Sequence, residues 1–263
     1  AVRIGSISET VTSPTELELP SGRRVLLEPV IRKENKIGVD DYFPCCVLLN
    51  NDLSNGVPPL LQDLDQLVMP PTDLGWAKRL KSSHFQHFAN VSSEFAREFN
   101  LDPWTIAPLF RYCGEINFMT REGEECLVRN ATMLLNAVKA KYQEYAIQDQ
   151  PFLVVKADAG TYGMAVMMIK DPQELVQLNR KQRTKMAAIK GGQSVSRVII
   201  QEGVYTFETV GLAESVAEPV VYMIGNHVVG GFYRVHAGRG VDENLNAPGM
   251  NFEPLAFAEA GID

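Results

Sequence analysis

The chain has 263 residues, of which 45% are hydrophobic and 22% are charged, an ordinary balance for a globular protein. This composition argues against a disordered, collagen-like or coiled-coil chain, and the apolar runs are far shorter than the roughly 20 residues of a membrane-spanning helix. Lys and Arg number 25 against 32 Asp and Glu, a net charge of −7. We therefore expect no general binding to nucleic acid or to a membrane, and any bound anion must be held by a local cluster.

The cysteines and the two ends of the sequence give further expectations. The four cysteines are Cys45, Cys46, Cys113 and Cys126, without a C-x-x-C spacing. Because no secretory signal is evident, we expect reduced thiols that pack as small hydrophobic side chains in a cytoplasmic protein. A strand pattern is already under way at residues 2–4, and 257–263 shows no closing element, which predicts an internal piece of a longer polypeptide.

The N-terminal half predicts short strands followed by helices. Residues 2–32 alternate strand-forming runs with turns, and Cys45–Leu49 is a continuous apolar run typical of a strand buried on both faces. A helix is expected after Ser82 or Ser83, either of which can act as its N-cap. Its apolar side chains recur at helical spacing, and we expect them in the core: Phe85, Phe88, Val91, Phe95 and Phe99. A longer amphipathic helix is expected over 122–146, with one apolar face: Leu127, Ala131, Leu134, Val138 and Tyr142.

From Pro151 onward the order is strand, glycine loop, strand, helix, strand and hairpin. The expected strands are Phe152–Val155, Met164–Ile169, Arg197–Gln201, Glu218–Ile224 and His227–Val235. A capping box at 171–174 opens the helix, and the dipeptide Gly225-Asn226 is a two-residue hairpin turn.

Lys156 leaves the end of a strand and opens a loop of small residues. The loop and the start of the next strand contain Asp158, Gly160, Thr161, Tyr162, Gly163 and Met164. Glycine lets backbone N–H groups approach phosphate oxygens closely, and the lysine adds a point charge. Neither a P-loop nor a dinucleotide fingerprint occurs. The alternative is a plain turn between two strands.

The third strand ends in Gln201-Glu202-Gly-Val204. The Glu202 carboxylate can accept from a hydroxyl or amino group, and the Val204 N–H can serve a ring nitrogen, as an adenosine reader requires. The alternative is a charged residue where a strand leaves the sheet.

The C-terminal hairpin and loop carry further charged and polar candidates. Arg234 can stabilise charge on a transferring phosphoryl group, or it can form a surface ion pair. The loop 241–249 contains oxygen donors of the type that Mg²⁺ prefers, Asp242, Glu243, Asn244 and Asn246, although an ordinary Asn/Asp-rich turn has the same composition.

The run Arg180-Lys-Gln-Arg-Thr-Lys185 is basic. Its three interpretations are a solvated helix face, a cover over phosphates and a nucleic-acid contact, which the net charge disfavours. His84 and His87 lack further ligands for a zinc site.

The order strand, lysine, glycine loop, strand, helix, strand and Gln-Glu-x-Val resembles the nucleotide-binding half of ATP-grasp ligases such as glutathione synthetase. Longer stretches look like the proteobacterial glutamate–cysteine ligase family, in consistent order over nearly the whole chain. They are KIGVDDYFPCCVLLNNDLS, EINFMTREGEECL, FLVVKADAGTYGM, LNRKQRTKM, VIIQEGVYTFE, AEPVVYMIGNHVVGGFYRVH and GVDENLNAPGMNFEPLAFA.

This resemblance implies a mixed α/β, ATP-grasp-like fold. Residues 1–150 would form part of a substrate-side domain with a helical segment, and 151–263 an incomplete nucleotide-binding region. The implied reaction joins the γ-carboxyl group of L-glutamate to L-cysteine through an acyl phosphate, with ATP and Mg²⁺, as the first step of glutathione synthesis. A homo-oligomer is compatible with the family. The rivals are another ATP-grasp ligase and a non-catalytic nucleotide-binding module.

The resemblance also implies roles for individual residues. Lys156 would hold the α and β phosphates under the loop 158–164, and Glu202 with Val204 would read adenosine. Arg234 would stabilise the transferring group. The implied Mg²⁺ ligands are Glu218, Asp242 and Asn244, with further ligands expected beyond Asp263.

Overall fold

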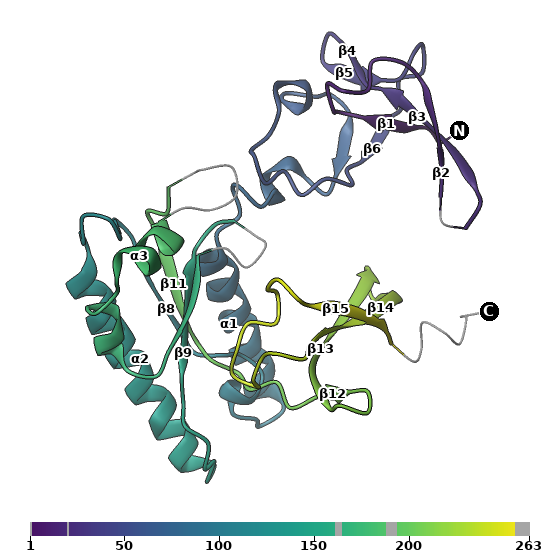
Figure 1. The fold of residues 1–263 in the computed structure, drawn as a ribbon. Helices are drawn as coiled ribbons and strands as arrows, with labels where there is room; N and C mark the ends of the chain where they lie inside the picture. Colours follow the sequence, from purple (N-terminus) through teal and green to yellow (C-terminus); the bar gives the residue numbers. More distant parts are fainter. Residues whose placement is uncertain (1, 20, 161–164, 188–193, 256–263) are drawn as a thin grey trace. The chain divides into compact units, whose positions relative to one another are not determined.

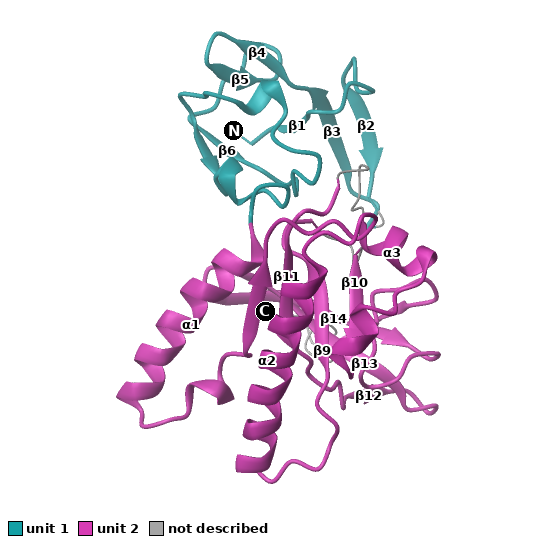
Figure 2. Ribbon diagram, turned by 90° about the vertical axis from the view of Figure 1, so that its left-hand side faces the viewer, with its two compact units in different colours: residues 1–79 teal, residues 80–263 magenta. Residues whose placement is uncertain are grey.

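The computed structural model describes residues 2–19, 21–160, 165–187 and 194–255. The chain forms two compact units, Ala1–Arg79 and Leu80–Asp263, coloured separately in Figure 2. The sequence predicts a functional division between residues 150 and 151, with substrate-side residues before it and nucleotide-binding residues after it. This division stays a prediction. The boundary between the compact units lies earlier, so that both long helices belong to the same unit as the glycine loop.

Unit 1 consists of short strands. Its elements are β1 (Ile4–Ser6), β2 (Thr15–Glu18), β3 (Arg24–Pro29), β4 (Ile31–Lys33), β5 (Lys36–Gly38), β6 (Cys46–Leu48) and β7 (Leu67–Met69), with 3-10 turns η1 (Pro59–Leu61) and η2 (Thr72–Leu74). They form sheets β1-β3-β2, β4-β5 and β6-β7. The expected alternation of strands and turns is confirmed. The expectation that Cys45–Leu49 is buried on both faces is wrong, since β6 pairs only with β7 and Leu48 is 79% exposed.

Among its described residues, unit 2 contains two four-stranded antiparallel sheets and three α-helices, labelled in Figure 1. The first sheet has the order β10-β9-β11-β8 and the second β12-β13-β14-β15. The strands are β8 (Phe110–Cys113), β9 (Leu153–Ala157), β10 (Val166–Ile169), β11 (Val198–Glu202), β12 (Thr209–Val210), β13 (Ser215–Ile224), β14 (His227–His236) and β15 (Asn251–Pro254). The helices are α1 (Lys81–Glu98), α2 (Glu124–Glu144) and α3 (Arg180–Ala187), with 3-10 turns η3 (Pro103–Thr105) and η4 (Pro172–Leu175). The fold is therefore mixed α/β, as expected.

The main core lies between α2 and one face of the first sheet. The α2 stripe expected from the sequence is buried as a whole, from Leu127 to Tyr142. It packs against Leu153, Val155 and Ala157 of β9 and the matching residues of β11. Because side chains alternate along a strand, Val154 and Lys156 lie on the other face of the same sheet. One face of the sheet is thus committed to the core, and the other is free to form a site.

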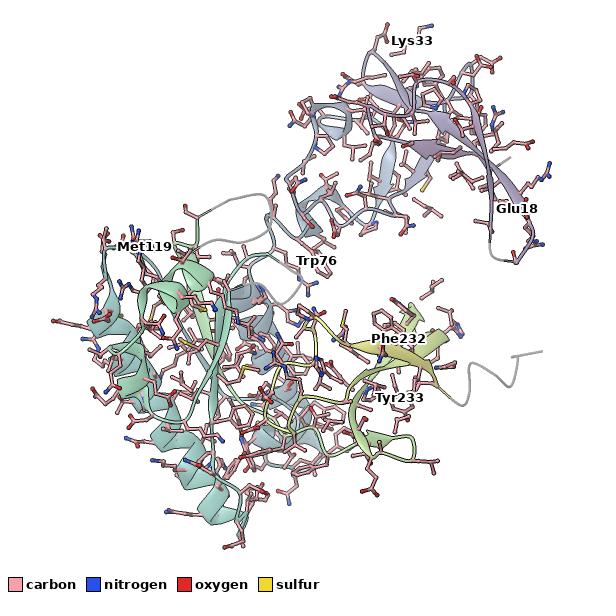
Figure 3. All side chains as sticks on the ribbon, in the orientation of Figure 1. Glu18, Lys33, Trp76, Met119, Phe232 and Tyr233 are labelled. Atoms are coloured by element: carbon pink, nitrogen blue, oxygen red, sulfur yellow. The ribbon has the colours of Figure 1, made fainter. Side chains whose placement is uncertain are left out.

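Side chains also alternate between the two faces of the second sheet, and this alternation places charged side chains on one face. Phe232 and Tyr233 leave β14 on opposite faces (Figure 3). Arg234 therefore shares its face with Phe232, and Glu218 lies directly opposite Arg234 on β13. The expected hairpin turn at 225–226 is confirmed between β13 and β14.

Helix α1 differs from the sequence expectation. Most of its apolar stripe is on the surface, with Phe95 50% and Phe99 60% exposed, and Phe85 is half-buried. The buried residues of the helix are Ser82, Ser92 and Ala96. Small side chains allow a helix to pack closely, and the rings instead contact one another, with the Phe95 and Phe99 centroids 4.5 Å apart. Within the described residues, no helix is long and apolar enough to cross a membrane.

Truncation of a side chain to alanine should have a large effect on stability in α2 and a small effect in α1. Leu134→Ala should lower the free energy of unfolding by about 2–5 kcal/mol, because it opens a cavity in the core. The control Phe95→Ala should change it by less than about 1 kcal/mol, because that ring is already half in water. Urea unfolding of both variants measures the difference, and equal losses would contradict the assignment of the core.

Candidate functional site

A cavity of about 490 Å³ lies on the side of the first sheet away from α2. Its walls include Phe85, Phe152, Val154, Val166 and Met168, and its polar rim includes Lys81 and Glu243. The cavity also brings together most of the residues predicted from the sequence: Lys156, Gly160, Gln201, Glu202, Val204, Glu218, Arg234, Asp242 and Asn244. Thr161, Tyr162, Gly163 and Met164 lie outside the described residues.

Lys156 is a half-buried cation on the floor of this cavity. Burial lowers the pKa of its ammonium group. Its Nζ has no hydrogen-bond acceptor among the described residues. In that part of the chain, no contact therefore offsets the free-energy cost of removing the ammonium group from water. Because a buried charge is costly without a partner, this position favours an anionic ligand.

Lys81, at the first position of α1, was missed by sequence reasoning. Its Nζ donates to the carbonyl oxygens of Ala157 at 2.9 Å and Gly160 at 3.0 Å. Burial and the neighbouring charge of Lys156 lower the pKa of Lys81 to about 8. A cation at a helix N-terminus opposes the macrodipole, and this is the sequence signal that could have found it.

Asp158 has a structural role in place of the predicted nucleotide contact. Its side chain is fully buried and does not line the cavity. Its two carboxylate oxygens accept from the Ser82 N–H and from the Ser82 hydroxyl, both at 2.7 Å, and the Arg197 Nε lies 3.5 Å away. The expected N-cap of α1, Ser82 or Ser83, is thus wrong. Leu80 occupies the cap position without a side-chain bond, and Asp158 satisfies the helix end from the glycine loop.

The end of β11 presents Gln201 to the cavity more directly than Glu202. Glu202 shares its strand face with the core residues Val198 and Ile200, and its carboxylate accepts from the Trp104 Nε1 at 2.8 Å and the Leu109 N–H at 3.1 Å. Burial raises the pKa of Glu202, and these two hydrogen bonds oppose the rise.

Gln201 and Val204 retain unused polar groups. The Gln201 Oε1 is buried and has no hydrogen-bond partner among the residues that the structure describes. The Val204 N–H has no acceptor in the described part of the chain, whereas the Gly203 N–H donates to the Phe152 carbonyl. An orphaned acceptor and a free backbone donor beside an apolar wall suit a flat heterocycle that carries both kinds of group.

Arg234 and Glu218 form an ion pair across β13 and β14, with the Arg234 Nη1 2.7 Å from the Glu218 Oε2. The alternative considered for Arg234, an ion pair, is therefore present. The Arg234 side chain lines the same cavity, and its buried Nε has no hydrogen-bond partner among the described residues. The Nη1 of the guanidinium is thus committed to Glu218, and the Nε is an unpaired donor in the described part of the chain.

The residues predicted as Mg²⁺ ligands do not form a metal site as they lie. Glu218 is paired with Arg234, and Asp242 lies 2.7 Å from the Lys170 Nζ, which lowers the pKa of Asp242. The Asn244 Oδ1 accepts from the Asn246 N–H within an Asx turn. Among the described residues there is no group of three His, Cys, Asp or Glu side chains that could hold a metal ion.

A second cavity of about 700 Å³ adjoins the first, and both share Val166, Met168 and Asn244. It is lined on one side by Lys185 and Met186 of α3 and on another by Arg239. Within the basic run, the Arg183 Nη1 turns back to the Leu178 carbonyl at 2.7 Å. Lys185 is therefore the basic side chain of the run that borders a cavity.

Comparison with known proteins gives the family of the chain. A family model described as "GshA: Glutamate-cysteine ligase" matches residues 1–262. The chain belongs to the glutamate–cysteine ligase family. A crystal structure of a protein from Methylobacillus flagellatus KT, provisionally named a gamma-glutamylcysteine synthetase, shares 50% sequence identity at a TM-score of 0.84. The match covers 97% of this chain and 60% of that protein, so the chain spans less than two thirds of its length. No curated protein matches the chain.

The Asp158 anchor of this family member predicts a large loss of stability on truncation. Asp158→Ala should lower the free energy of unfolding by about 2–4 kcal/mol, since it leaves the buried Ser82 donors without acceptors. Asp171→Ala is the matched control, because Asp171 is an exposed residue that caps the turn η4 and an N-cap contributes about 1 kcal/mol. Denaturant titration measures both, and a loss no larger than that of the control would contradict the anchor.

Proposed function

We propose that the chain carries the ATP-binding part of a ligase that joins the γ-carboxyl group of L-glutamate to L-cysteine. The single observation that carries this proposal is the half-buried Lys156 ammonium, which has no acceptor among the described residues. Lys156 lines one cavity with Gln201 and Arg234, whose Oε1 and Nε are buried without a hydrogen-bond partner among the described residues. Because the chain belongs to the glutamate–cysteine ligase family, the reaction that we propose for this anion site is the ligation of L-glutamate to L-cysteine. The arrangement supports an ATP-grasp type of nucleotide site, with the glycine loop and β9–β11 around the nucleotide.

The lining residues fit the parts of ATP. Val154, Val166 and Met168 offer an apolar wall for adenine, and the Val204 N–H and Gln201 Oε1 offer a donor and an acceptor for its edge. This revises the role given to Glu202, whose carboxylate orients Trp104 and the Leu109 N–H instead. Lys156 would hold phosphate oxygens, and Lys81 fixes the carbonyls from which the loop 158–164 departs.

The mechanism depends mainly on positioning and on charge neutralisation. When bound, ATP supplies a phosphoryl group to the γ-carboxylate of L-glutamate, and the cysteine amine then displaces phosphate from that carbon to leave an amide. Lys156 and the free Arg234 Nε offset negative charge on the phosphate oxygens. Glu218 holds the Arg234 guanidinium in place from the opposite strand, because its carboxylate occupies the Nη1 side.

Mg²⁺ is implied by the family resemblance, and its ligands stay a prediction. Each of the acidic candidates is paired with a cation, so the described residues do not fit the ion and no step is assigned to it.

The adjoining cavity supports a place for an amino-acid substrate. Its Lys185 Nζ is without an acceptor in the part of the chain that the structure describes, and a carboxylate would pair with it. Arg239 lies on the same cavity but already binds Glu243 at 2.6 Å.

The proposed function is tested by substrate-dependent release of phosphate. The protein is incubated with ATP, Mg²⁺ and L-glutamate, with either L-cysteine or a different amine. Release that requires both L-glutamate and L-cysteine supports the proposal. Release with another carboxylate–amine pair would indicate a different ligase and would overturn the proposal. Failure of the protein to bind ATP would also overturn it.

Lys156→Ala should weaken ATP binding by about 1.5–3 kcal/mol, the scale of a hydrogen bond to a charged group. Isothermal titration calorimetry measures the affinity. Lys139→Ala, on the exposed side of α2, is the control for loss of one positive charge. Equal effects of the two substitutions would show that only the long-range charge matters.

ATP affinity should also fall as the pH rises above about 8, the pKa of Lys81. Below that pH Lys81 carries its proton with or without nucleotide, so binding takes up none at this group. Above it the free protein has lost the proton, whereas a bound triphosphate favours the cation, so binding takes up a proton. Calorimetry at pH 8.5 in buffers of different ionisation enthalpy measures this uptake. Lys81→Met should reduce it, and unchanged uptake would assign the proton to another group.

A further inference from the structure

Two cysteine thiols outside the cavity lie side by side. The Cys113 Sγ at the end of β8 and the Cys126 Sγ in the first turn of α2 are 3.9 Å apart. Neither residue lines the nucleotide cavity. Cys45 and Cys46 belong to unit 1. The sequence spacing of 113 and 126 carries no recognised pattern, and only the packing of α2 against β8 brings the two sulfur atoms together.

A polar network holds the pair in place. The Asn130 Nδ2, one turn along α2 from Cys126, donates to the Cys113 Sγ at 3.1 Å and to the Cys126 Sγ at 3.4 Å. The Arg111 Nη1 donates to the Asn130 Oδ1 at 3.3 Å, which directs the amide hydrogens toward the sulfurs. The Arg129 Nη2 lies 3.7 Å from the Cys126 Sγ. A purely hydrophobic packing role would not require these donors.

The two thiols differ in access. Cys113 is 3% exposed, whereas Cys126 is only half-buried. Burial, with a contribution from Cys126, raises the pKa of Cys113 to about 11. Cys113 is therefore a poor nucleophile at neutral pH when both thiols are reduced, and an external reagent reaches Cys126 first.

We propose that Cys113 and Cys126 form a disulfide modification site that a low-molecular-weight disulfide oxidises. In the first step the Cys126 thiolate attacks one sulfur of the reagent RSSR, forming a mixed disulfide and releasing RS⁻. In the second step Cys113 loses its proton and attacks the Cys126 sulfur, which expels the second RS⁻ and forms the Cys113–Cys126 bond. The two protein thiols are oxidised, and RSSR is reduced to two RSH, which take up the two protons.

The geometry allows this bond with small movements. The sulfurs must approach from 3.9 Å to about 2.05 Å. The bond would close a short loop and tie the edge strand β8 to α2, so the oxidised protein should be more resistant to unfolding. Leu109, which precedes β8, donates to Glu202 at the cavity, so the linked strand also ends at the proposed nucleotide site.

The test uses the Cys45→Ser, Cys46→Ser background, which leaves only this pair, and oxidised glutathione as the probe. After alkylation of the remaining thiols and digestion with trypsin, mass spectrometry should find peptides 112–121 and 122–129 joined. The intact protein should lose a pair of hydrogen atoms and retain no glutathione, and dithiothreitol should reverse the change. Its Tm should rise on oxidation.

Two further variants separate the steps. Cys113→Ser should accumulate a stable glutathione adduct on Cys126, since the resolving thiol is absent. Cys126→Ser should form an adduct on Cys113 at least tenfold more slowly. The proposal is overturned if the adduct on Cys126 persists with Cys113 present, if no joined peptides form, or if Cys113 reacts first.

Discussion

The site depends on the hydrogen bonds between the buried carboxylate of Asp158 and the first turn of α1. The carboxylate accepts from the N–H and hydroxyl of Ser82 and so replaces the missing side-chain cap of α1. In return, Lys81 at the same helix end binds the carbonyls of Ala157 and Gly160. These reciprocal contacts join segments more than seventy residues apart in the sequence. They fix the point where the glycine loop leaves β9, and therefore the position of Lys156, two residues before Asp158.

The second constraint is the two-residue period of the first sheet. Leu153, Val155 and Ala157 pack on α2, which forces Val154 and Lys156 to the cavity side. Such local patterns could be predicted from the sequence. The apolar stripe of α2 and the hairpin turn at 225–226 depend on neighbours within a few residues, and both occur as expected. The capping box at 171–174 is also present, but it opens the 3-10 turn η4 and not the expected helix, which begins only at Arg180 as α3. Most of the residues that line the cavity could be predicted for the same reason, because they belong to short local sequence patterns.

The remaining features depend on contacts between distant segments. Glu202 faces Trp104 because of strand parity, and the acidic candidates meet cations, Arg234 and Lys170, that spacing cannot reveal. The stripe of α1 has the periodicity of a core helix, yet its small residues are the ones that pack. Periodicity states which side chains share a face. It does not state whether that face meets another element.

Because Trp104 contacts Glu202, the site can also be followed by tryptophan fluorescence. The sequence has two tryptophans, Trp76 in unit 1 and Trp104 in unit 2. The Trp104 indole N–H donates to the carboxylate of Glu202, which borders the cavity, and its ring lies 4.9 Å from that of Tyr145. Replacing Trp76 by Phe would leave a single indole emitter whose emission maximum follows the charge and hydration of Glu202. Occupancy of the cavity could then be followed in real time without a labelled nucleotide.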